Sequence, residues 1–149
     1  MWACRNGHTS VVQLFLNHSE QIIELNASIF YGNTAFMDAC TSGHKGVVQL
    51  LLNHSIRIDL NARDKYGKTA FMKACGHGKT DIVQLLLDHS DPNIELNARS
   101  SSGKTVFMMA IDLAFQNAYD EDSDIVKLLL EHYNKCNNVP KKLSTFLNF

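Results

Sequence analysis

Cysteine and histidine recur together along the chain and could bind a metal ion. Cys4 and His8, and likewise Cys40 and His44, lie four residues apart, as paired ligands of a zinc site can. However, Cys4, Cys40 and Cys75 recur 36 and 35 residues apart, so their spacing follows a repeat. Equivalent positions in a stack of helices lie about 8–10 Å apart, which is too far for a disulfide. We therefore expect no metal site, and buried cysteines in a reducing compartment.

Catalytic patterns are weak. Residues 76–80, Gly-His-Gly-Lys-Thr, faintly resemble the end of a phosphate-binding loop, but the upstream glycine and the preceding strand are missing. Neither a pair of catalytic carboxylates nor a nucleophile with an assignable base stands out. We expect a protein that is not an enzyme and needs no cofactor.

The cysteines and histidines discussed above belong to a repeated unit. Residues 61–90 have a preceding copy that starts at Asn26 and a following copy that starts at Asn97. The copies begin at Asn26, Asn61 and Asn97, so the period is 35 and then 36 residues. A period in this range is typical of stacked units, because one unit cannot bury its apolar face alone.

Each unit predicts two short helices and a turn. Apolar side chains recur at helical spacing over residues 69–75, and Gly78 ends this first helix. Thr80 and Asp81 are expected to cap a second helix, whose leucine-rich arc is wide enough to pack against neighbours on two sides. Residues 62–68 then predict a tight turn or short hairpin that leads into the first helix.

The unit resembles the ankyrin repeat, which combines a β-turn with two helices and has the signature Thr-Pro-Leu-His-x-Ala. The signature is occupied by Thr34-Ala-Phe-Met-Asp-Ala39, Thr69-Ala-Phe-Met-Lys-Ala74 and Thr105-Val-Phe-Met-Met-Ala110. The histidine of the signature is replaced by Met37, Met72 and Met108, which are predicted to stack from repeat to repeat. The resemblance implies an all-α fold, an ankyrin-repeat solenoid of stacked helix-turn-helix units with short β-turn or hairpin tips.

The copies predict the boundaries of the array. We expect an ankyrin-repeat array over residues 1–133 and a C-terminal tail or capping segment at 134–149. The array comprises a partial repeat at 1–19, repeats at 26–55 and 61–90, and a fourth repeat at 97–133 with an insertion at 111–124. Because the first repeat begins inside its first helix, we expect a fragment of a longer array, with an imperfect cap as the alternative.

The insertion in the fourth repeat predicts a longer first helix. Residues 111–119 have helical spacing, and the acidic run Asp120–Asp122 is expected to form the turn after it. Asp124 is then expected to cap the second helix, at residues 125–133.

Composition limits the classes of partner. The chain has 149 residues, of which 45% are hydrophobic and 19% charged, with a net charge of -1. This balance gives no reason to expect nucleic acid or an anionic membrane as a partner. No apolar run is long enough for membrane insertion, and no signal peptide is apparent. We expect an intracellular monomer, in the cytoplasm or alternatively in the nucleus.

The resemblance implies a protein partner, held in a concave groove between the turn tips and the outward sides of the first helices. A stack that is already ordered loses little entropy on binding. The predicted partner-binding residues are Phe30, Tyr31, Arg63, Lys65 and Tyr66 on the tips, and Asp38, Thr41, Ser42, Lys73, His77 and Met109 on the first helices. At an exposed tip, Phe30 and Tyr31 are either interaction anchors or packing against the neighbouring turn.

We therefore predict a noncatalytic protein–protein interaction module, used as a scaffold or adaptor. Two alternatives are a structural spacer array and a regulatory fragment of a larger enzyme whose catalytic domain lies outside this chain. The turn asparagines Asn26, Asn61 and Asn97 also resemble acceptors of asparaginyl hydroxylation, although the longer loops shift the upstream leucine.

Overall fold

Paired helices and projecting turns make up the described part of this computed structural model, which covers residues 1–18, 24–54, 58–89, 94–116 and 123–137. In chain order, its α-helices are α1 (Trp2–Arg5), α2 (Thr9–Asn17), α3 (Ala35–Ser42), α4 (Lys45–Asn53), α5 (Ala70–Gly76), α6 (Thr80–Asp88), α7 (Val106–Gln116) and α8 (Ser123–Asn137). Strands β1 (Ser28–Ile29) and β2 (Asn33–Thr34) pair antiparallel and are joined by the 3-10 turn η1 (Phe30–Gly32).

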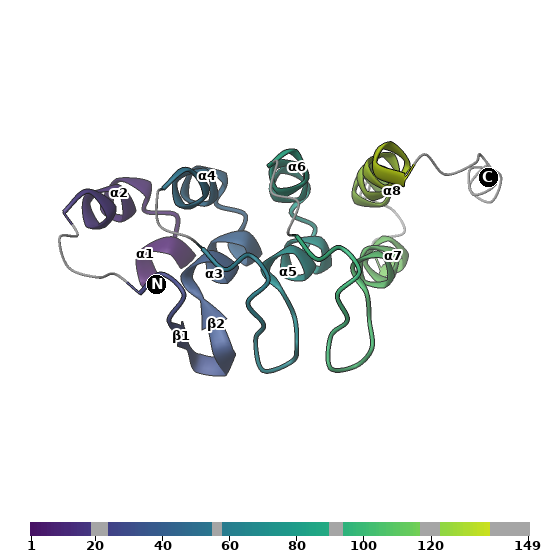
Figure 1. Ribbon diagram of the computed structural model, residues 1–149, viewed down its shortest axis with the longest axis horizontal. Coiled ribbons are helices and arrows are strands. Elements are labelled where there is room, and N and C mark those ends of the chain that lie inside the picture. Colours follow the sequence, from purple (N-terminus) through teal and green to yellow (C-terminus); the bar gives the residue numbers. More distant parts are fainter. Residues whose placement is uncertain (19–23, 55–57, 90–93, 117–122, 138–149) are drawn as a thin grey trace.

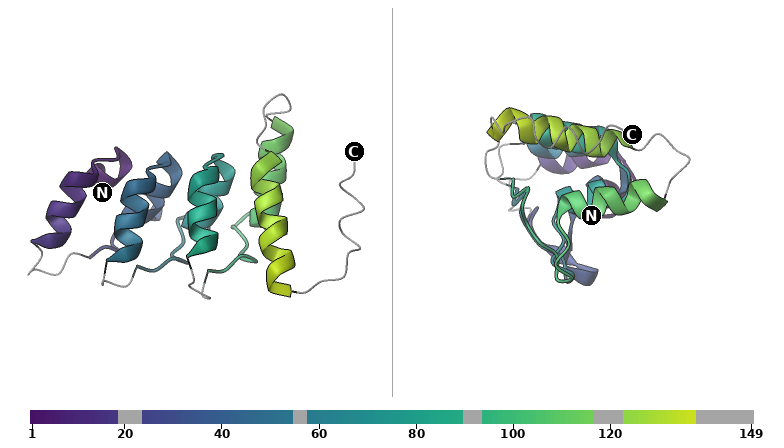
Figure 2. Two further views of the ribbon diagram at one scale, coloured as in Figure 1. Left: turned by 90° about the horizontal axis from the view of Figure 1, so that it is seen from above. Right: turned by 90° about the vertical axis from the view of Figure 1, so that its right-hand side faces the viewer.

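The helices form two layers that run side by side (Figure 1). Helices α1, α3, α5 and α7 contact one another in that order, and α2, α4, α6 and α8 form the second layer in the same way. Each repeat adds one helix to each layer, and the turns project from one edge of the stack, as the end view in Figure 2 shows. The predicted all-α solenoid of helix-turn-helix units is confirmed.

The first helix of each repeat begins at the threonine of the signature. The hydroxyl oxygens of Thr34 and Thr69 accept hydrogen bonds from the amides of Met37 and Met72, at 3.2 and 3.3 Å. These contacts satisfy backbone donors that the helix itself leaves unpaired. The threonines are therefore caps outside the helices, a role that the sequence prediction missed when it began the helix at Thr69.

The second helices begin differently from the prediction. In α6 the capping position is Lys79, with no side-chain cap, and Thr80 is already the first helical residue. Thr80 therefore does not cap this helix, and that prediction is wrong. Asp81 lies in the first turn, where its negative charge is favoured by the helix dipole.

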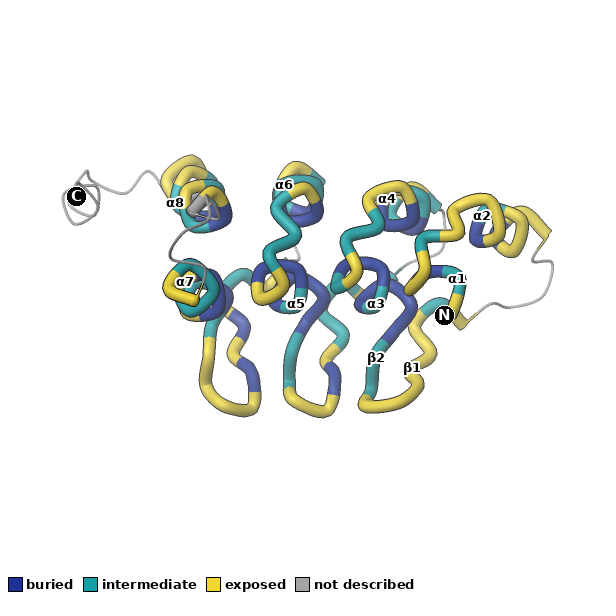
Figure 3. The backbone as a smooth tube through the Cα atoms, turned by 180° about the vertical axis from the view of Figure 1, so that it is seen from behind, coloured by how far each residue is buried: buried dark blue, intermediate teal, exposed yellow. Residues whose placement is uncertain are grey.

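The core lies between the layers and between neighbouring repeats (Figure 3). Met37 and Met72 are fully buried there, as are Phe36 and Phe71. Met108 occupies the equivalent position in the last repeat but is exposed. The predicted methionine stack thus holds for the inner repeats, since only there does a described neighbour cover the side chain.

Side chains at the N-terminal end of the array are also left exposed, because no described repeat precedes the first one. Val11 and Phe15 are exposed, whereas the equivalent residues of the next repeat, Val47 and Leu51, are buried. Burial at these positions therefore depends on a preceding repeat.

The last repeat has the longer first helix that the insertion predicts. Helix α7 has 11 residues, compared with 8 in α3 and 7 in α5, and it ends at Gln116. Helix α8 starts at Ser123 and continues to Asn137, so the helix passes the predicted end at residue 133. Asp124 lies within its first turn, so the prediction that Asp124 caps this helix is wrong. The predicted acidic turn at Asp120–Asp122 and most of the tail lie outside the described residues.

Candidate protein-binding surface

The turns of the second and third tips are closed by a short polar side chain. The Oδ1 atom of Asp64 accepts hydrogen bonds from the amides of Tyr66 and Lys68, at 2.9 and 2.8 Å. In the following tip, the Ser100 hydroxyl accepts from the amide of Lys104 at 3.2 Å. Side chains that bond to the backbone a few residues onward are a common way to stabilise a turn.

The first tip lacks such a side chain and closes in another way. Ile29 stands where the other tips have Asp64 and Ser100, and it cannot accept a hydrogen bond. The chain instead forms the β1–β2 hairpin, and Tyr31 adopts a left-handed conformation with φ of 66°. This conformation is uncommon for residues other than glycine. It leaves Phe30 83% and Tyr31 62% exposed at the tip.

Neighbouring tips are joined by backbone hydrogen bonds. The amide of Lys65 donates to the carbonyl of Tyr31 at 2.7 Å, and the amide of Ser101 donates to the carbonyl of Tyr66 at 2.8 Å. The tips are thereby fixed relative to one another as a row along one edge of the stack (Figure 1).

Gly67 permits the second of these links. It has a φ of 69°, and an added Cβ atom would lie 2.8 Å from the amide nitrogen of Ser101. Gly103 has a φ of 77° at the equivalent position, yet a Cβ atom there would meet nothing within 4 Å. Both glycines thus have a positive φ, but only Gly67 has the backbone of the neighbouring tip close to the position of a Cβ atom.

We expect Gly67→Ala to lower the free energy of unfolding by about 2 kcal/mol, because it adds a steric clash to the strain of a left-handed alanine. Gly103→Ala is the matched control and should lower it by about 1 kcal/mol, from the backbone strain alone. Urea unfolding followed by circular dichroism measures both values. Equal losses would show that the contact between the tips does not require glycine.

Lys65 brings the aromatic rings of two tips together. Its ammonium nitrogen lies 3.5 Å from the ring centroid of Tyr31 and 4.7 Å from that of Tyr66. A cation over the face of a tyrosine ring is attracted by the ring quadrupole. Phe30, Tyr31, Lys65 and Tyr66 form what we call the tip cluster, and Tyr66 is 53% exposed. Four of the predicted partner-binding residues therefore lie together at the surface.

Known protein families can be compared with this arrangement of stacked helix pairs and linked tips. A family model described as ankyrin repeats (3 copies) matches residues 1–64 and 56–141, which together span most of the chain. The chain belongs to the ankyrin repeat family. Repeats of this family generally act as protein–protein interaction modules and are typically noncatalytic. A search of curated proteins found no match.

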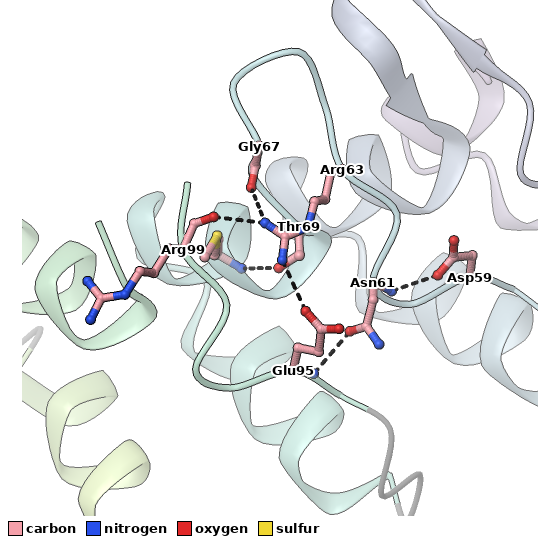
Figure 4. Close-up of polar contacts among 8 residues, drawn as sticks. Asp59, Asn61, Arg63, Gly67, Thr69, Glu95 and Arg99 are labelled. Carbon is pink, nitrogen blue, oxygen red and sulfur yellow. Dashed lines mark hydrogen bonds and ion pairs between the residues drawn. The ribbon is translucent and has the colours of Figure 1, made fainter. Parts of the chain in front are cut away.

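Arg63 was predicted as a partner-binding residue, but in this ankyrin array it ties one repeat to the next. Its Nη1 atom donates to the carbonyl of Arg99 at 2.8 Å, and its Nη2 atom lies 3.0 Å from Oε2 of Glu95 (Figure 4). The side chain is still exposed, so its charge contributes to the surface.

Lys73 is also engaged within the protein and is not a free contact. Its ammonium nitrogen lies 2.9 Å from Oδ2 of Asp64, and the two side chains are only 12% and 1% exposed. Burial alone would raise the pKa of Asp64, but hydrogen bonds from Lys73 and from the amides of Lys68 and Tyr66 outweigh it and hold the pKa below its ordinary value. The prediction that Lys73 faces a partner freely is therefore corrected.

The remaining predicted residues on the first helices differ in exposure. The Thr41 hydroxyl donates to the carbonyl of Met37 at 2.7 Å, and the Nδ1 atom of His77 donates to the carbonyl of Lys73 at 2.8 Å. Burial raises the pKa of Asp38, although Arg5 and Lys73 attract its charged form. His77 and Ser42 are exposed, whereas Asp38 and Thr41 are partly exposed.

Met109 contradicts the prediction of an accessible contact, because its side chain is buried. In the last ankyrin repeat, the exposed methionine is Met108, one position earlier. Met109 does line an open groove between α5 and α7, together with Lys68, His77 and Lys104.

The three cysteines at the repeat position are buried, as predicted. Cys4, Cys40 and Cys75 are free thiols in the core, and burial raises the pKa of Cys75 to about 12. Such thiols stay protonated at neutral pH, so they are poor nucleophiles and poor metal ligands. Across the described residues, no cluster of three or more potential metal ligands occurs.

Histidine at the Gly-His position has a structural contact. The Nε2 atom of His44 donates to the carbonyl of Arg5, one repeat earlier, at 2.9 Å. In the first repeat, the His8 ring stacks on Trp2 with the ring centroids 4.9 Å apart. These contacts give the repeated histidines a packing role.

Within the part of the chain that is described, no helix is both long and apolar enough to cross a bilayer.

Proposed function

We propose that this chain is a noncatalytic protein-binding module of a scaffold or adaptor, and that it holds its protein partner at the tip cluster. The observation that carries the proposal is the exposure of Phe30, Tyr31 and Tyr66 on two neighbouring tips. Large aromatic side chains contribute much of the free energy at protein interfaces, especially where they cluster.

The support beneath these rings favours binding. The hydrogen bond from Lys65 to the carbonyl of Tyr31 fixes the two tips, and the Lys65 ammonium group sits against both tyrosine rings. Because the rings are already held, little conformational entropy is lost when a partner covers them. Exposed aromatic residues that are held in this way are more useful to a binding surface than to a spacer.

The first helices extend the proposed surface on one side. His77 and Ser42 are exposed, and Thr41 is partly exposed. Arg63 and Lys73 stabilise the array through their ion pairs, so their removal would damage the fold as well as the surface. A test of binding therefore has to leave these two residues in place.

We expect the double variant Phe30→Ala, Tyr66→Ala to bind a specific partner at least about tenfold more weakly, since each anchor contributes on the order of 1–2 kcal/mol. The matched control is Phe115→Ala, which removes an aromatic ring that is 80% exposed on α7, away from the tips. Partners are captured from a cell lysate on each immobilised protein, and the dissociation constant of a captured partner is then measured by calorimetry.

Circular dichroism and thermal melting confirm that the parent, the double variant and the control are all folded before they are immobilised. Full retention of the partner by the double variant would exclude the tip cluster as the binding site. If neither the parent nor the control captures a specific partner, the spacer alternative gains support.

A further inference from the structure

The connections between the repeats share a sequence pattern. Ile58-Asp-Leu-Asn-Ala62 and Ile94-Glu-Leu-Asn-Ala98 both place an acidic residue between two aliphatic residues, just before the turn asparagine. Ile58, Leu60, Ile94 and Leu96 are partly buried and pack against the hydrophobic core.

Two turn asparagines, Asn26 and Asn61, each accept a hydrogen bond from the backbone of the next connection. The side-chain oxygen of Asn26 accepts a hydrogen bond from the amide of Asp59 at 2.9 Å. The side-chain oxygen of Asn61 accepts from the amide of Glu95 at 3.0 Å (Figure 4). In both cases the bonded amide belongs to the acidic residue of the pattern.

Arg63 adds a charged contact to the second of these sites. Its guanidinium group binds the carboxylate of Glu95 at 3.0 Å, and also the carbonyl of Arg99 at 2.8 Å. Asn61 and Arg63 therefore bind the same residue, Glu95. Asn61 accepts from its backbone amide, and Arg63 pairs with its carboxylate.

The last repeat carries the same two side chains. Asn97 and Arg99 stand at the positions of Asn61 and Arg63. Among the described residues, Arg99 donates only to the carbonyl of Gly103, at 3.1 Å, and no hydrogen bond of the Asn97 side chain is found. In Figure 4, the Arg99 guanidinium group points away from Arg63, toward the last repeat.

Both residues line an open groove of about 610 Å³ at the C-terminal end of the array. We call this the end groove; Phe107, Leu129 and Tyr133 belong to its apolar wall, and the Arg63–Glu95 ion pair also lines it. The rings of Phe107 and Tyr133 meet edge to face, with their centroids 6.3 Å apart. The end groove thus combines an amide acceptor, a guanidinium group and an apolar wall.

We propose that the end groove binds an extended segment of a partner protein in which an acidic residue lies between two aliphatic residues. The amide of that acidic residue donates to Asn97, and its carboxylate pairs with Arg99. The aliphatic side chains pack against Phe107, Leu129 and Tyr133. The occupant is inferred from Ile94–Leu96 one repeat earlier, where the Glu95 amide donates to Asn61, the Glu95 carboxylate pairs with Arg63, and the two aliphatic side chains pack against the core.

The described segments of the same pattern in a second copy of this chain are poorly suited to fill the groove. Residues 58–60 and 94–96 already pack against the core of their own molecule, and the amides of Asp59 and Glu95 are bonded to asparagines. Releasing either segment would break contacts inside the donor molecule. A separate partner with an accessible segment avoids this loss.

The probe is a fluorescent peptide with the sequence of residues 91–98, Asp-Pro-Asn-Ile-Glu-Leu-Asn-Ala, titrated with the full chain and followed by anisotropy. We expect saturable binding that becomes at least about tenfold weaker for Arg99→Ala or Asn97→Ala, because each removes one bond to the peptide. A peptide with glutamine in place of its glutamate should also bind at least about tenfold more weakly.

A second peptide, methylated on the amide nitrogen of its glutamate, cannot donate to Asn97 and should bind as weakly as the unmodified peptide binds to Asn97→Ala. The variant Phe30→Ala, Tyr66→Ala should bind the unmodified peptide normally, which separates this site from the tip cluster. Absence of saturable binding to the folded parent would overturn the proposal. So would equal binding of the methylated peptide, or unchanged binding by Arg99→Ala.

Discussion

Replacing Phe71 with alanine is expected to lower the free energy of unfolding by about 3–5 kcal/mol, the usual range for a large aromatic side chain in a packed core. Phe71 is only 2% exposed and belongs to α5, which contacts α3, α6 and α7. A cavity here weakens the third repeat together with both of its neighbouring interfaces. The stability of a repeat array is approximately the sum of such terms, so the loss spreads along the stack.

Guanidinium unfolding followed by circular dichroism gives the free energy for parent and variant. Phe115→Ala is the control, because Phe115 is 80% exposed and its removal should change the free energy by less than about 0.5 kcal/mol. A loss for Phe115→Ala equal to that for Phe71→Ala would contradict the two-layer packing.

Asp64→Ala is expected to lower the free energy of unfolding by about 3 kcal/mol. The substitution removes the acceptor for the amides of Tyr66 and Lys68, and it leaves the nearly buried ammonium group of Lys73 without its partner. Breaking a buried ion pair from one side is strongly destabilising, because an uncompensated charge remains. Ser100→Ala is the matched control at the equivalent turn and should lower the free energy by about 1 kcal/mol.

The effect of Asp64 should depend on pH in a defined direction. Its pKa is lower in the folded protein than in the unfolded chain, so the folded state favours the charged carboxylate. The resulting stabilisation is fully present above the ordinary carboxyl value of about 3.9 and is lost as the pH falls through the lower folded-state pKa. Unfolding measured between pH 7 and pH 2 should therefore show the parent approaching Asp64→Ala only at the acid end. A constant difference would contradict the ion pair as its source.

Features that recur at the repeat period could be predicted from the sequence. The burial of Cys40, Cys75 and Met72 followed from their recurrence, since a position flanked by two neighbours in a stack is covered on both sides. The longer helix α7 followed from the helical spacing within the insertion. Met108 departs from the pattern because no described repeat follows it.

Contacts between different repeats could not be predicted in the same way. The pairing of Arg63 with Glu95 joins residues 32 positions apart, and nothing in the local sequence indicates that these side chains meet. The engagement of Lys73 depends on the path of the second tip, which brings Asp64 against α5. The role of Ile29 was visible in principle, since the other tips have a polar side chain at that position.

Bonds between the tips also determine how the array resists force. The tip edge of the stack is joined by one backbone hydrogen bond between each pair of tips, from Lys65 to Tyr31 and from Ser101 to Tyr66, and by a few side-chain contacts of Lys65 and Arg63, whereas packed helices join the other edge. A single hydrogen bond contributes about 1 kcal/mol, far less than a packed helix interface. Under tension along its axis, the array should therefore open first at the tips and bend away from them. A protein that binds Phe30 and Tyr66 at the same time would hold these two tips together and so increase the resistance of the array to bending.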